Sequence, residues 1–290
     1  MKNDWLDRSE YPFPPRYFSI NGQQLHYIDE GRGETLLFVH GTPSWSFDFR
    51  KLIKGLKADY RCVAVDHIGF GLSDKPERYD YSTQNHSQTL EKFVLEKQLE
   101  NVTLVVHDFG APIGLNVAMH HPERIKGLVI LNAWLWSSTH DPDFAKLARA
   151  LRNPLLPFLY RTLNFSPRFL LPRSFGDQKL SPSLLKQYTR PFKNRRQRQG
   201  PLAFARSLLL DQDWFESLWY KKYDIAEKPG LLIWGMKDPL IKPAFLAKFQ
   251  AGFPQATTVV LDGCGHFPQE ECPAEVEQAI RTFLGSGCGV

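Results

Sequence analysis

The chain has 290 residues, of which 42% are hydrophobic and 23% charged. This length and composition predict a globular protein that buries roughly three-quarters of its unfolded surface, as one domain with an insertion. The formal net charge of +5 is mild. The basic run at residues 193–198 has no interleaved aromatic residues, so it indicates a solvated loop or helix end and no nucleic-acid partner.

The four cysteines do not form the pattern of a metal site. They are Cys62, Cys264, Cys272 and Cys288, with neither a Cys-x-x-Cys pair nor a histidine at ligand spacing. We therefore expect neither a zinc site nor a disulfide scaffold.

The chain begins with a polar segment, residues 1–16, which is rich in proline and aromatic side chains. It lacks the apolar core of a signal peptide or a membrane helix, which predicts a cytoplasmic protein without a membrane partner. Residues 17–20 and 24–28 are then predicted to be strands joined by Asn21-Gly22, a dipeptide typical of tight hairpins.

Buried strands and helices alternate along most of the remaining chain. Short apolar runs predict strands at residues 34–40, 61–65, 104–106, 127–131, 230–234 and 257–261. Helices are predicted between or after them at residues 52–56, 82–99, 111–119, 243–249 and 273–284. With the hairpin, this alternation predicts an α/β fold with a mostly parallel eight-stranded sheet flanked by helices. The glycine-rich loop at 66–76 lacks the spacing of a nucleotide-binding loop.

The stretch from Thr103 to Gly114 predicts a strand, a tight turn and a helix. A short apolar run ends at His107-Asp108-Phe109-Gly110, and Pro112 falls in the first turn of the following helix. This resembles the nucleophile elbow of α/β-hydrolases, with Asp108 where serine usually stands. An ionised carboxylate needs no base to attack a saturated carbon, and the product of that attack is an ester of the enzyme.

The composition changes after Trp136. Residues 137–223 contain no buried-strand run, and their helical stretches are separated by prolines. A helical insertion between two strands of a parallel sheet predicts a cap domain over residues 137–223. The core domain is then formed by residues 1–136 and 224–290.

Three predicted strand ends carry reactive side chains, in the chain order Asp108, Asp238, His266. This is the order of nucleophile, acid and base in α/β-hydrolases. We expect Asp108 to displace a leaving group from carbon and His266, oriented by Asp238, to activate water against the resulting ester. The backbone N–H groups of Thr42 and Phe109 are expected to form the oxyanion hole.

Several motifs together resemble the haloalkane dehalogenases. They are Tyr11-Pro12-Phe13, Tyr27-Ile28-Asp29-Glu30-Gly31, His40-Gly41-Thr42-Pro43-Ser44-Trp45-Ser46, Gly69-Phe70-Gly71-Leu72-Ser73-Asp74-Lys75-Pro76, Thr103 to Asp108, Leu131-Asn132-Ala133 and Gly235-Met236-Lys237-Asp238. The resemblance covers the core and is weak in the cap. It implies hydrolysis of a carbon–halogen bond of small haloalkanes to alcohol and halide, with a small apolar substrate and water as partners and without a metal or cofactor.

The chain departs from that family at the halide site. The family has a tryptophan after the nucleophile, whose indole N–H holds the halide, and here Phe109 has no donor. The resemblance therefore leaves Thr42, Phe109, Trp134 and Trp136 as candidates for substrate or halide binding. The cap edge also offers Trp214 and Trp219, and for each of the four tryptophans taken singly packing is the simpler explanation.

Other readings of the same residues stay open. Epoxide hydrolases share the aspartate nucleophile and use two cap tyrosines as proton donors; here the cap region offers Tyr160, Tyr188, Tyr220 and Tyr223. β-Lactone decarboxylases also resemble this family. A small-molecule binding protein on a hydrolase fold is the alternative from outside enzymes, although a binder has no need of His266 or Asp238. No pattern in the sequence indicates an oligomeric state.

Overall fold

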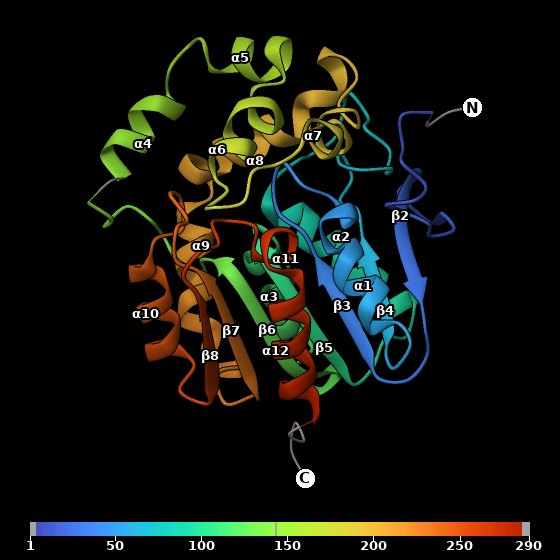
Figure 1. Ribbon diagram of the computed structural model, residues 1–290. Helices are drawn as coiled ribbons and strands as arrows, with labels where there is room; N and C mark the ends of the chain where they lie inside the picture. The colour runs from blue at the N-terminus through green and yellow to red at the C-terminus, as the bar shows by residue number, and fades with distance from the viewer. Residues whose placement is uncertain (1–3, 143, 286–290) are drawn as a thin grey trace.

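The computed structural model describes residues 4–142 and 144–285, and one eight-stranded sheet runs through it (Figure 1). The strand order is β1-β2-β4-β3-β5-β6-β7-β8. The strands are β1 (Arg16–Ile20), β2 (Gln23–Glu30), β3 (Thr35–Val39), β4 (Arg61–Val65), β5 (Val102–Asp108), β6 (Ile125–Ala133), β7 (Gly230–Gly235) and β8 (Ala256–Leu261). Only β2 pairs antiparallel, with β1 and with β4, so the predicted mostly parallel sheet is confirmed.

Helices cover both faces of the sheet because the central strands are apolar on both sides. On β3, Leu36 and Phe38 pack into a buried cluster with α1 (Arg50–Leu56) and α12 (Pro273–Gly285). Leu37 and Val39 pack into another cluster with α2 (Thr83–Glu96), α3 (Gly110–His120) and α10 (Pro243–Gly252). The elements outside the cap are η1 (Ser46–Phe49), α1 (Arg50–Leu56), α2 (Thr83–Glu96), α3 (Gly110–His120), η2 (Pro122–Arg124), α10 (Pro243–Gly252), α11 (Pro268–Glu271) and α12 (Pro273–Gly285).

Between β6 and β7 the described residues form helices and connecting segments but no strand. These helices are α4 (Phe144–Leu151), α5 (Leu156–Leu163), η3 (Ser166–Leu170), α6 (Leu171–Arg173), α7 (Pro182–Thr189), η4 (Arg195–Arg198), α8 (Gln199–Leu210), α9 (Gln212–Lys221) and η5 (Lys222–Asp224). Figure 1 shows most of them above the carboxyl ends of the parallel strands. We call residues 137–223 the cap; that they form a separate domain stays a prediction.

The sequence predicts no disulfide scaffold, and the described residues contain a single disulfide. The structure joins Cys264 and Cys272, which lie on either side of α11 with their Cα atoms 6.6 Å apart. Their spacing carried no sign of this, because a disulfide requires only that two Cβ atoms meet in space. Cys62 is a buried free thiol, and Cys288 lies outside the described residues. Because disulfides are uncommon in the cytosol, this bridge does not support a cytoplasmic location, which stays a prediction.

A fully buried histidine on α2 has no polar partner. His86 packs 4.9 Å from the ring of Phe204 and 5.3 Å from that of His67, between ring centroids. Neither of its ring nitrogens has a hydrogen-bond partner among the described residues. Burial lowers the pKa of His86 to about 3, with a smaller contribution from His40.

We expect His86→Phe to stabilise the protein, and to do so most strongly under mildly acidic conditions. The unfolded chain protonates this histidine near pH 6.5, whereas the folded chain resists until far lower pH. The wild type therefore loses up to about 1.4 kcal/mol of its free energy of unfolding per pH unit below that point. Urea unfolding between about pH 7 and pH 5 measures the slope. The matched change His140→Phe, at an exposed site, should leave the slope of the free energy of unfolding against pH unaltered. Equal slopes in the wild type and His86→Phe would contradict this account.

Candidate active site

The turn after β5 holds Asp108 in a strained conformation. Its φ of +53° lies in the left-handed region, which non-glycine residues rarely adopt. Gly110 follows at the start of α3, where an added Cβ would clash with the carbonyl oxygen of Val39. The close approach of β3 thus requires glycine at 110, and the sharp turn lifts the Asp108 side chain above the sheet.

The loop after β3 holds one oxygen of this carboxylate. The backbone N–H of Thr42 donates to Asp108 Oδ1 at 2.8 Å. Gly41 lies so close that an added Cβ would clash with the same oxygen. A donor already in contact with Oδ1 is suitably placed to stabilise negative charge that develops there.

His266 and Asp238 form a buried pair beside Asp108. His266 Nδ1 bonds Asp238 Oδ2 at 2.7 Å, and His266 Nε2 lies 3.4 Å from Asp108 Oδ2. The structure thus brings together the three side chains that the sequence singles out. The second distance is longer than a good hydrogen bond.

The charges of the two carboxylates act on the histidine. Burial acts to lower the pKa of His266, but Asp238 and then Asp108 outweigh it and raise the pKa to about 10. Burial also acts to raise the pKa of Asp238, yet His266 and two backbone N–H groups outweigh it, so that pKa is lowered. The position of His266 beside Asp238 and Asp108 therefore favours its protonated form in the free protein.

Two further residues hold this pair, and neither role was predicted from the sequence. Asn132, at the end of β6, donates through Nδ2 to Asp238 Oδ2 at 2.9 Å and accepts from the backbone N–H of Gly235 at 2.8 Å. His107 donates through Nε2 to the carbonyl oxygen of His266 at 2.7 Å. A polar residue that ends a buried strand was the available signal for Asn132.

A cavity of about 550 Å³ lies over Asp108, between the sheet and the cap. Thr42, Phe109 and His266 line its floor, and apolar side chains of α4, α5 and α8 line much of the rest. The hydroxyl of Thr42 is buried without a hydrogen-bond partner among the described residues. The Phe109 ring packs edge-on to Trp134, with centroids 4.7 Å apart.

The aromatic candidates separate once their positions are known. Trp134 lines the cavity, whereas Trp136 is not among the lining residues and packs against Trp219 and Phe249. Sequence could not distinguish Trp134 from Trp136, because both follow the same strand and only the path of the chain decides which faces the cavity.

The cap tyrosines also separate. Tyr160 lines the cavity, and burial raises its pKa to about 12. Tyr188 points elsewhere and donates to Glu270 at 2.7 Å, while Tyr220 and Tyr223 are largely exposed. A pair of tyrosine donors, which an epoxide hydrolase needs, is therefore not assembled from these four residues.

The site combines a carboxylate, a histidine–aspartate pair and an apolar cavity. Such a carboxylate can attack an electrophilic carbon, and the histidine can move a proton of water. No group of three or more His, Cys, Asp or Glu side chains within residues 4–142 and 144–285 is arranged to hold a metal ion.

Known proteins share this arrangement of the chain. Residues 34–273 match the family of the alpha/beta hydrolase fold. The cis-3-alkyl-4-alkyloxetan-2-one decarboxylase of Shewanella oneidensis is 37% identical over 94% of this chain and 89% of its own. Haloalkane dehalogenase 2 of Mycobacterium tuberculosis is 31% identical over 96% of this chain and 98% of its own.

Solved structures agree with this result. The crystal structure of the haloalkane dehalogenase DatA from Agrobacterium tumefaciens C58 superposes with a TM-score of 0.84 at 26% identity, covering 94% of this chain and 96% of that one. The chain therefore belongs to the α/β-hydrolase family, as a haloalkane dehalogenase-like enzyme.

Proposed function

We propose that the chain hydrolyses the carbon–halogen bond of a small apolar haloalkane through a covalent ester on Asp108. The observation that carries this proposal is the position of Asp108 at the floor of an apolar cavity, with Oδ1 held by Thr42. In the first step Asp108 Oδ2 attacks the substrate carbon. A carbon–oxygen bond forms, and the electron pair of the carbon–halogen bond leaves with the halide.

The second step returns the enzyme to its starting state. Esterification removes the charge of Asp108, which lowers the pKa of His266, so that His266 releases its proton to solvent and becomes neutral. His266 then takes a proton from a water that attacks the ester carbonyl carbon, while the N–H groups of Thr42 and Phe109 stabilise the oxyanion on Oδ1. Collapse of this intermediate expels the alkoxide, which takes the proton back from His266 and leaves as the alcohol. Asp108 is then a carboxylic acid that holds the second proton of the water, and transfer of this proton to His266 restores the Asp108 carboxylate and the imidazolium.

The departing halide needs donors, and two side chains of the cavity wall could replace the missing indole at position 109. The Trp134 indole carries an N–H, and the Thr42 hydroxyl has no partner among the described residues. A hydrogen bond to a charged group contributes about 1.5–3 kcal/mol, enough to affect the rate strongly if it forms as the halide departs.

We expect Trp134→Phe to reduce kcat/KM for halide release by roughly 10- to 100-fold, because it removes one donor from the leaving group. Trp136→Phe is the matched control, since it makes the same change two residues away and outside the cavity lining. Halide release from 1-bromobutane measures both. If the two variants lose activity equally, Trp134 does not bind the halide.

A β-lactone is the second candidate substrate. The leaving oxygen of a β-lactone is part of its ring, so no halide departs and no halide donor is needed. The side chain of Phe109, which has no hydrogen-bond donor, is compatible with such a substrate. The Shewanella oneidensis relative is named for an oxetanone with two alkyl substituents. A cavity of about 550 Å³ with mostly apolar walls could hold such chains.

A parallel assay separates these candidates. The wild type is incubated with a panel of bromo- and chloroalkanes, with a cis-3,4-dialkyloxetan-2-one and with styrene oxide, and halide, carbon dioxide and diol are measured. Halide release that is lost in Asp108→Ala supports the proposal. Carbon dioxide and alkene without halide would move the assignment to the β-lactone, and diol alone would move it to the epoxide.

A further inference from the structure

The cap concentrates positive charge far beyond the average of the chain. Residues 144–198 contain thirteen lysines and arginines and one acidic residue, Asp177, whereas the whole chain has a formal net charge of only +5. The remainder of the chain is therefore net acidic. Such an asymmetry produces a directed field, which favours an anionic partner on the side of the cap.

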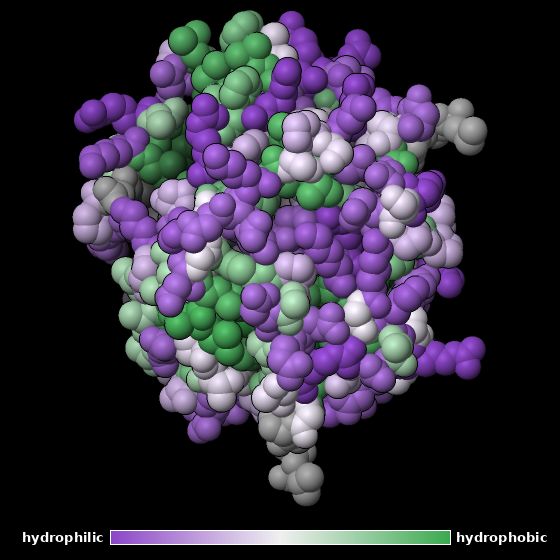
Figure 2. Space-filling view, viewed as in Figure 1, coloured by the Kyte–Doolittle hydropathy of each residue, from purple (hydrophilic) through white to green (hydrophobic). Residues whose placement is uncertain are grey.

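The same helices expose large apolar side chains. Leu155 and Phe158 on α5 are 61% and 51% exposed, and Leu163, Phe169 and Leu170 are exposed beside them in the chain. Figure 2 shows an apolar area at the top of the molecule, over α5, with hydrophilic residues around it. Clustered exposed apolar side chains are unusual on a monomer and indicate an interaction surface.

Basic side chains lie directly beside this apolar area. The guanidinium carbons of Arg168 and Arg173 are each 6.0 Å from the ring centroid of Phe169. Arg198 donates to the carbonyl oxygens of Arg161 and Thr162, both at 2.9 Å, which docks η4 against α5. Lys193 and Arg198 of the basic run line one hollow with Arg168, which neighbours Phe169 in the chain.

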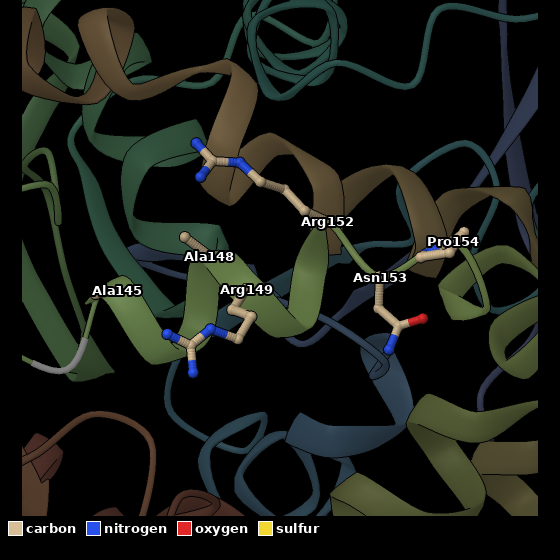
Figure 3. A pocket seen from close by; sticks show the side chains of 6 residues that line it. All are labelled: Ala145, Ala148, Arg149, Arg152, Asn153 and Pro154. Atoms are coloured by element: carbon tan, nitrogen blue, oxygen red, sulfur yellow. The ribbon is translucent and has the colours of Figure 1, made fainter.

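Two surface hollows lie among these cations. One, of about 530 Å³, is lined by Arg168, Arg190 and Arg198, with Asp4 at its wall. The other, of about 690 Å³, is lined by α4 and the residues after it, including Arg149, Arg152 and Pro154 (Figure 3). Hollows of this size and charge could accept phosphate-containing head groups.

The catalytic cavity opens toward this surface. Leu147 on α4 and Leu170 at the end of η3 both line the cavity and are exposed. Leu151, Leu156 and Tyr160 line it from the inner sides of α4 and α5. An apolar molecule leaving a lipid phase at the cap would therefore reach Asp108 along apolar walls.

We propose that the outer face of the cap binds the surface of an anionic lipid bilayer, from which apolar substrate enters the cavity. Phosphate and serine head groups match the arginines, and the acyl region covers Leu155 and Phe158. A nucleic acid would match the charge but leave these apolar side chains in water. A second copy of this face would repel the first. The membrane contact does not rest on the proposed reaction; only the route of the substrate does.

No helix of the described residues is long and apolar enough to cross a membrane. The proposed contact is accordingly a surface one, in which side chains of α4, α5 and η3 reach the head-group region. This revises the expectation of no membrane partner, which considered only signal peptides and spanning helices.

Vesicle co-sedimentation tests the contact. The full chain is mixed with vesicles of phosphatidylcholine alone or with about 30 mol% phosphatidylserine. We expect pelleting only with the anionic vesicles, and a partial loss on raising salt from about 0.1 to about 0.5 M, because head-group attraction is screened while apolar insertion persists.

Two double variants separate the two contributions. Arg149→Glu/Arg152→Glu should weaken the partition roughly 20-fold or more, since each basic residue changes it about fivefold. Leu155→Ser/Phe158→Ser should abolish the salt-resistant fraction. The matched controls on the core surface are Arg32→Glu/Arg78→Glu and Leu95→Ser/Val260→Ser, all at exposed positions. Thermal unfolding confirms that each variant is folded.

The outcomes decide the proposal. Equal pelleting with neutral and anionic vesicles, or equal loss in cap variants and core controls, would overturn it. Binding to heparin or RNA without binding to vesicles would also overturn it, in favour of a polyanion site. Turnover of a water-soluble bromoalkane should be unchanged in Leu155→Ser/Phe158→Ser. Vesicle binding by a protein that shows no turnover would instead indicate that the proposed reaction is wrong and the membrane contact right.

Discussion

His266→Gln should accumulate a covalent adduct on Asp108 when the protein is mixed with its substrate. Glutamine can keep a hydrogen bond to Asp238 but cannot take a proton from water, so the ester forms and is not hydrolysed. Intact-protein mass spectrometry should show a gain equal to the alkyl group, and peptide mapping should place it in the segment that contains Asp108.

The double variant Asp108→Asn/His266→Gln is the control, and it should show no gain in mass because the attacking oxygen is gone. His140→Gln, at an exposed site, should turn over substrate like the wild type. If His266→Gln releases product with no adduct at any time, the two-step scheme is wrong. An adduct with the whole mass of a β-lactone would show that Asp108 opens the lactone ring.

Asp108→Asn should lower turnover by roughly 10⁴-fold or more, because loss of a nucleophile removes the covalent route altogether. The substitution should also lower the pKa of His266, which is raised to about 10 in the wild type. The reason is that Nε2 of His266 lies 3.4 Å from the Asp108 carboxylate, and the amide that replaces this carboxylate carries no charge, as the ester carries none. NMR titration of the imidazole protons measures this pKa directly.

The pKa of His266 should fall in Asp108→Asn for the same reason that it should fall in the ester. To act as a base, His266 needs a lower pKa in the ester intermediate than in the free enzyme. Hydrolysis of the ester should then become faster as the pH rises through the pKa that His266 has in the ester intermediate. Asp224→Asn, at an exposed site, is the matched control and should leave the pKa unchanged. If the pKa of His266 is the same in Asp108→Asn as in the wild type, the Asp108 carboxylate does not stabilise the protonated form of His266.

Much of the fold could be predicted from local patterns. The apolar runs of the central strands are buried on both sides and too short for helices, which predicted the parallel sheet. Gly110 and Pro112 predicted the turn and the start of α3 around Asp108. The cap could be recognised only as a change in composition, because its helices pack through irregular, proline-broken contacts that leave no simple period.

Details of the site depended on contacts between distant parts of the chain. Asn132 reaches Asp238 across 106 positions of sequence. Cys264 and Cys272 meet because α11 folds the chain back on itself. Trp134 and Trp136 both follow the end of β6, and the sequence does not show which of them faces the cavity. The packing of Trp136 against Trp219 shows that Trp136 lies away from it.

The order of residues along the chain was enough to specify the sheet, the elbow and the sequence of the three strand-end residues, since each depends on side-chain periodicity and on the few residues that permit a sharp turn. The shape of the cavity, the residues that hold His266 and Asp238, and the joining of basic and apolar side chains on the outer face of the cap followed from the folded chain alone. These properties depend on contacts between segments that are far apart in the chain, so no local sequence pattern predicts them.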